Sequence, residues 1–106
     1  MRDDPRRIAD MREALERIRG FVTAGRASFF ADAKTNEAVA YEVLKLGEAA
    51  SRVSASFRRS HPEVPWSRLA GLRNEIVHEY FRVDLDDLWE FVQTEMVTLD
   101  RALRKI

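Results

Sequence analysis

Residues 84–105 read DLDDLWEFVQTEMVTLDRALRK, and the spacing of their apolar side chains predicts one amphipathic α-helix. The apolar positions are Leu85, Leu88, Trp89, Val92, Met96, Leu99 and Leu103. Steps of mostly three and four residues place these side chains on one face of a helix. Asp84 is suited to cap the N-terminus, with Asp87 three residues later in the manner of a capping box. Acidic residues crowd the start of this helix and basic residues its end, as the helix dipole favours.

Three earlier stretches show the same spacing. Their apolar stripes are Ile8, Met11, Leu15, Ile18 and Val22; then Val39, Val43, Leu46, Ala50, Val53 and Phe57; then Leu69, Leu72, Ile76 and Tyr80. The second helix is expected to continue through Phe57 and to end before His61, because a residue that precedes proline is pushed out of the α region. Residues 28–31 add one short helical turn. We therefore predict an all-α fold, an antiparallel up-and-down bundle of four long helices and a short one, forming a single domain over residues 1–106.

Gly47 lies inside the second predicted helix, where glycine costs about 1 kcal/mol relative to alanine. Such a glycine indicates either the close approach of another backbone or neutral drift. The sequence does not separate these two explanations.

The composition excludes several classes of protein. The 18 Lys and Arg residues balance 18 Asp and Glu residues, so the chain lacks the positive excess of proteins that coat nucleic acid indiscriminately. The absence of cysteine excludes disulfides, thiolate metal sites and cysteine nucleophiles. No apolar run approaches the roughly 20 residues of a membrane span, and no signal-peptide pattern is visible. We expect a cytoplasmic protein that contacts no membrane.

The third predicted helix carries the residues best suited to chemistry, Arg73, Asn74 and His78. Cleavage of RNA without a metal requires a base for the 2′-hydroxyl, an acid for the leaving 5′-oxygen and a cation for the phosphorane. Histidine suits the first two roles because its unperturbed pKa lies near neutrality, and arginine suits the third. Asn74 could orient the histidine ring through a hydrogen bond.

An ordinary structural explanation competes with catalysis. Arg73 and His78 lie about 140° apart on an ideal helix, so they converge only across a two-fold axis or through a swing of the arginine side chain. Judged from the residues alone, a structural role is more frequent than a catalytic one. His78 would then be an ordinary surface histidine, and Arg73 would pair with a neighbouring acid such as Glu75. His61 precedes a proline and is interpreted as a loop residue.

The motif Arg73-Asn74-x-x-x-His78-x-Tyr80 resembles the R-x4-H-x-Y signature of HepT-like toxins in the HEPN superfamily. Three other segments are similar to that family in the same order, namely Leu46-Gly47-Glu48-Ala49-Ala50, Pro62-x-x-Pro65-Trp66, and Val83-Asp84 followed by Trp89. The arginine–histidine spacing alone is a weak pattern, whereas four segments at the right separations form a strong one.

The resemblance implies a function as well as a fold. It implies a symmetric homodimer that packs through the motif helices, and a metal-independent endoribonuclease with Arg73 and His78 in a cleft between protomers. Asn74 would support them, and tRNA would be among the RNA targets. The implied partner is a MntA-like nucleotidyltransferase antitoxin that blocks the toxin by transferring AMP from ATP to Tyr80. No cofactor or metal is implied. The alternative is a non-catalytic HEPN-like helical module that docks a nucleotidyltransferase or a nucleotide.

The charge of the chain is unevenly distributed. Residues 58–82 carry five arginines against three glutamates, while residues 83–106 carry three basic and six acidic side chains. Arg58, Arg59 and Arg68 are therefore candidates for RNA binding beside Arg73, because guanidinium groups bind phosphate with two parallel hydrogen bonds. A GC-rich genome, which favours arginine codons, explains most of the arginines equally well.

Overall fold

The computed structural model describes residues 3–106, so the first two residues of the predicted domain lie outside the described part. The elements are α1 (Asp4–Phe21), α2 (Arg26–Ala31), α3 (Ala33–Ser51), α4 (Ala55–Ser60), α5 (Trp66–His78), α6 (Leu85–Glu90), the π-helix η1 (Phe91–Glu95) and α7 (Met96–Arg104). The all-α prediction is confirmed. Two short helices, α2 and α4, accompany the long ones, where the sequence predicted only one.

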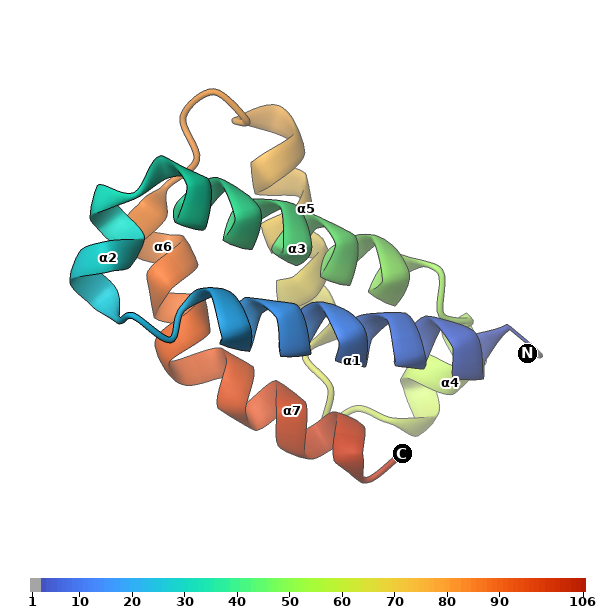
Figure 1. Ribbon diagram of the computed structural model, residues 1–106. Coiled ribbons are helices and arrows are strands. Elements are labelled where there is room, and N and C mark those ends of the chain that lie inside the picture. Colours follow the sequence, from blue (N-terminus) through green and yellow to red (C-terminus); the bar gives the residue numbers. More distant parts are fainter. Residues whose placement is uncertain (1–2) are drawn as a thin grey trace.

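Helices α1 and α3 lie side by side and antiparallel, joined through α2 (Figure 1). Helix α5 packs on α3, and the α6–η1–α7 segment continues under α1 (Figure 1). The predicted stripes supply most of the core, and their most completely buried large side chains include Met11, Leu15, Ile18, Leu46, Leu69, Leu72, Leu99 and Leu103. Phe29 and Phe91, which belong to no predicted stripe, are as completely buried. No helix of residues 3–106 is both long and apolar enough to cross a membrane.

The second predicted helix is interrupted before Phe57, so its expected continuity was wrong. Ser54 adopts an extended backbone and caps α4 by accepting a hydrogen bond from the Phe57 amide at 3.2 Å. The buried Asp4 carboxylate of α1 in turn accepts hydrogen bonds from the Ser54 amide at 2.8 Å and its hydroxyl at 2.7 Å. A serine that finds such partners favours a helix boundary over a helix interior.

The last predicted helix begins at its Asp84 cap, whose carboxylate accepts from the Asp87 amide at 3.1 Å. The sequence did not predict the π-helical turn that interrupts it. Phe91 and Met96 are both buried, 0% and 6% exposed, and stand five residues apart. Because a π turn pairs residues i and i+5, it lets both side chains face the core, where a regular helix would turn Glu95 inward.

Candidate functional site

Gly47 lies where α3 and α5 approach each other closely. A β-carbon at this position would lie 2.5 Å from the Arg73 β-carbon and 2.9 Å from the Leu69 carbonyl oxygen. Real β-carbons do not tolerate such distances, so glycine is required by the close approach. Of the two explanations that the sequence left open, the structure supports this one. The contact also fixes the place of Arg73 on the bundle.

Arg73 is held by two side chains. Its Nε donates a hydrogen bond to the Glu48 carboxylate of α3, and its Nη1 donates to the Asn74 amide oxygen at 2.9 Å. The Arg73 and Glu48 side chains are 37% and 34% exposed, so the guanidinium is both anchored and accessible. Sequence reasoning did not single out Glu48, although this residue stands beside Gly47 in the segment that carried the family resemblance.

His78 is the last residue of α5 and lies exposed at its end. Asn74 and Val77 are exposed on the same side of the helix, where residues three and four apart are neighbours. Within residues 3–106 the structure gives no contact between the Arg73 and His78 side chains, as their separation of about 140° around the helix requires. One chain therefore brings Arg73 and Asn74 together and leaves His78 apart from Arg73.

Tyr80 does not belong to the apolar stripe of α5, and this expectation was wrong. The helix ends at His78, and Tyr80 lies in the following turn with 67% of its surface exposed. The buried stripe of α5 ends at Ile76, because Val77 and His78 are already exposed. The Tyr80 ring instead contacts that of Phe81, with centroids 4.4 Å apart.

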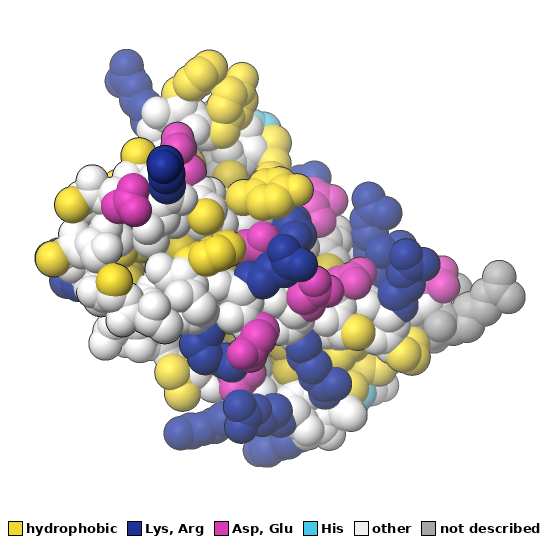
Figure 2. Space-filling model, viewed as in Figure 1, with side chains coloured by type: hydrophobic (Ala, Val, Ile, Leu, Met, Phe, Trp, Pro, Cys, Tyr) yellow, Lys and Arg dark blue, Asp and Glu magenta, His cyan; other side chains and the backbone are white. Residues whose placement is uncertain are grey.

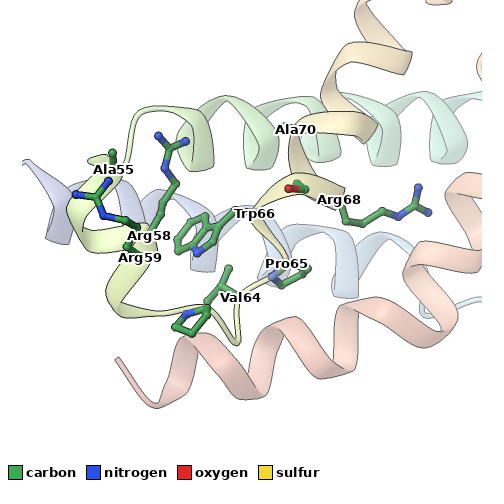
Figure 3. A pocket seen from close by; sticks show the side chains of 10 residues that line it. Ala55, Arg58, Arg59, Val64, Pro65, Trp66, Arg68 and Ala70 are labelled. Carbon is green, nitrogen blue, oxygen red and sulfur yellow. The ribbon is translucent and has the colours of Figure 1, made fainter.

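The three arginines expected to bind RNA separate into two groups. Arg58, Arg59 and Arg68 all line one cavity of about 700 Å³ beside Trp66, but the Arg68 side chain extends away from the other two (Figure 3). Within residues 3–106 neither Arg58 nor Arg59 forms an ion pair. Two uncompensated guanidinium groups beside an aromatic ring suit the phosphates and bases of RNA.

Arg68 is already paired with acids of the last helical segment. Its Nε donates to Glu95 at 2.7 Å and its Nη2 to Asp87 at 3.0 Å. These contacts, above all the hydrogen bond to Glu95, hold the pKa of Arg68 above its ordinary value. Burial and a hydrogen bond with Asp87 also raise the pKa of Glu75. Arg68 thus neutralises an acidic cluster between α5 and α6 and is not open to phosphate as Arg58 and Arg59 are.

Comparison with known proteins identifies the class to which this arrangement belongs. The family described as Ribonuclease HepT-like matches residues 11–106. A protein of Thermococcus cleftensis, named as a probable ribonuclease HepT, is 34% identical over 100 residues, covering 93% of this chain and 91% of the relative. An inferred RNase of Caldanaerobacter subterraneus subsp. tengcongensis is 30% identical over 92 residues, covering 87% of this chain and 80% of that protein. No solved structure matches.

The relatives and the fold thus define a class of small all-helical ribonucleases. The chain belongs to the HepT-like ribonuclease family.

Proposed function

We propose that this protein is a metal-independent endoribonuclease toxin that cleaves RNA, tRNA included, in the cytoplasm. The observation that carries the proposal is the anchored guanidinium of Arg73, held by Glu48 and Asn74 on an accessible surface of the helix that ends in His78. A cation fixed before the substrate arrives stabilises developing charge without reorganisation. The relatives named as ribonucleases support the same reaction class.

The chemistry follows from the properties of these side chains. Neutral His78 takes the proton from a ribose 2′-hydroxyl, whose oxygen attacks the adjacent phosphorus. Arg73 balances the negative charge of the phosphorane. The bond to the 5′-oxygen breaks, that oxygen receives a proton from a protonated histidine, and the products are a 2′,3′-cyclic phosphate and a free 5′-hydroxyl.

A homodimer would bring the Arg73 and His78 side chains together, which one chain alone does not do. The exposed strip of Asn74, Val77 and His78 on α5 includes an apolar residue that is 40% exposed, which suits a contact with a second copy. Packing of two such strips about a two-fold axis brings His78 of one protomer towards Arg73 of the other. Each dimer would then contain two copies of His78, one to act as the base and one as the acid.

A cleavage assay on purified protein tests the reaction. We expect the protein to cut a tRNA pool at the same rate with and without EDTA, and to leave 2′,3′-cyclic phosphate ends that resist 3′-end labelling until acid opens the cyclic phosphate and phosphatase removes it. Intact tRNA in all conditions would contradict the ribonuclease proposal. Cleavage that EDTA abolishes would contradict metal independence alone.

The α4 cavity gives a second prediction. Arg58→Ala and Arg59→Ala are each expected to weaken RNA binding and to reduce the slope of log affinity against log salt concentration by about one, because each removes one phosphate contact. Arg68→Ala is the control and should leave the slope unchanged, since Glu95 and Asp87 occupy that guanidinium. Fluorescence anisotropy with a catalytically inactive parent measures these slopes. An equal effect of Arg68→Ala would show that Arg68 also faces RNA.

We further propose that a MntA-like nucleotidyltransferase antitoxin restrains this toxin by modifying Tyr80. The exposed phenolic oxygen attacks the α-phosphorus of ATP, pyrophosphate leaves, and the phenolic proton passes to a base of the transferase. The added AMP places an anion and an adenine two residues from His78, where they compete with RNA by charge and by volume. The 67% exposure of Tyr80 supports access by the transferase.

Mass spectrometry tests the modification site. After incubation with the partner and ATP, we expect the added mass of AMP on the peptide that contains Tyr80. Tyr80→Phe should abolish it, whereas Tyr41→Phe, which alters a similarly exposed tyrosine at 59%, should not. Retention of the AMP mass by Tyr80→Phe would contradict the assignment.

A further inference from the structure

A second cavity, of about 400 Å³, lies between α3 and the loop that joins α5 to α6. Its lining includes Tyr41, Leu44, Ile76, Tyr80, Phe81 and Arg82. Hydrophobic side chains gather over this loop, at the top of Figure 2. Tyr80, which lines the cavity, follows His78 of the proposed active site by two residues.

The aromatic residues of this cavity are unusually exposed. Phe81 is 87% and Tyr80 67% exposed, and their rings lie 4.4 Å apart and tilted by 39°. Tyr41 is 59% exposed on the α3 side of the cavity. Aromatic side chains usually contribute to stability by being buried in the core, and neither Tyr80 nor Phe81 is buried. Their exposed ring faces are therefore available to a ligand.

One paired and one unpaired cation lie near the rings. The Lys45 ammonium lies 5.2 Å from the centre of the Tyr41 ring but is paired with the Glu42 carboxylate at 3.2 Å, whereas Arg82 lines the cavity beside Phe81. Within the described residues Arg82 forms no ion pair. On the α3 side the cavity is lined by the acidic Glu37 and by Asn36, whose amide donates to the Phe29 carbonyl oxygen at 3.1 Å. Exposed aromatic faces with an arginine beside them suit a base that carries its phosphate, because proteins bind single-stranded nucleic acid by stacking bases on aromatic rings next to basic side chains.

We propose that this cavity binds one unpaired base of the RNA substrate, stacked on Phe81 and Tyr80, next to the phosphate that is cleaved. The proposal rests on the ribonuclease function proposed above. It also explains how modification of Tyr80 would inhibit, because the adenine of the attached AMP would be tethered beside the subsite that the RNA base must occupy.

The test measures binding separately from cleavage. In a His78→Ala parent, Phe81→Ala is expected to weaken binding of a single-stranded oligoribonucleotide about tenfold, within the range for loss of one stacked base. Phe81→Trp should retain affinity, because it preserves a ring face. Phe21→Ala is the matched control, since it removes an exposed phenylalanine, 40% exposed, at the end of α1. The oligoribonucleotide is then tested with each base removed in turn. At one position, removal of the base should weaken binding to the His78→Ala parent but should not further weaken binding to the variant that also carries Phe81→Ala.

Three results would overturn the subsite. Unchanged affinity of Phe81→Ala would exclude stacking on that ring, while cleavage by the wild type would keep the ribonuclease proposal intact. An equal loss of RNA affinity in Phe21→Ala would show that removal of any exposed phenylalanine weakens binding. Loss of self-association in Phe81→Ala, measured by sedimentation velocity, would assign the surface to a protein contact. Absence of both RNA binding and cleavage in the wild type would instead reject the proposed function itself.

Discussion

His78→Ala is expected to lower the rate of RNA cleavage by at least about 100-fold, because loss of a positioned proton-transfer group costs roughly two to four orders of magnitude. The substitution should leave folding intact, since His78 is the exposed last residue of α5. Single-turnover cleavage of tRNA and thermal unfolding by circular dichroism measure the two effects. In cells, the wild type expressed without its partner should arrest growth and the variant should not.

His61→Ala is the matched control for this experiment. The chain has two histidines, and His61 lies in the loop after α4, with its ring 4.4 Å from that of Phe57 and its Nδ1 3.4 Å from Glu63. Its loss should reduce stability slightly and leave cleavage unchanged. If His61→Ala abolished cleavage and His78→Ala did not, the proposed active site would be in the wrong place.

Gly47→Ala is expected to destabilise the protein and to impair cleavage together. The new β-carbon would meet the Arg73 β-carbon at 2.5 Å, and overpacking of this kind costs about 1–3 kcal/mol. The better helix propensity of alanine returns only about 1 kcal/mol of this cost. Separation of α3 from α5 would also displace Arg73 from Glu48, and a shift of about 1 Å in a catalytic group can cost 100-fold in rate.

Gly71→Ala on the neighbouring helix, α5, is expected to change the free energy of unfolding in the opposite direction. A β-carbon at Gly71 meets nothing within 4 Å, so this substitution should stabilise the protein by about 0.5–1 kcal/mol. Urea unfolding compares the two variants. Equal stability of Gly47→Ala and Gly71→Ala would contradict the close approach of α3 and α5.

The helices were predictable because their evidence is local. Apolar residues at helical spacing are visible along the chain, and Asp84 acts as the cap that its position indicated. The sequence failed where a boundary depends on a distant residue. The interruption at Ser54 depends on Asp4, 50 positions earlier, and the π turn depends on the burial of both Phe91 and Met96.

The helix that carries the candidate residues was predictable, but the contacts of these residues were not. The motif placed Arg73, Asn74 and His78 on one helix, as the structure has them. It did not reveal that Glu48 anchors Arg73, because that ion pair joins helices 25 positions apart. Nor could composition show that Arg68 faces Glu95 and Asp87 while Arg58 and Arg59 form no ion pair within residues 3–106, since the two kinds of arginine are identical in sequence.

The helical fold, the buried face of most helices and the motif could be predicted from the amino-acid sequence alone. These properties follow from the 3.6-residue period and from side-chain chemistry, which are local features of the chain. The tertiary structure decided which charges are neutralised, where α5 ends and which aromatic rings stay exposed. These outcomes depend on how the helices pack against one another. Helix packing is set by contacts such as that of Gly47 with Arg73, which join residues that become neighbours only when the chain folds.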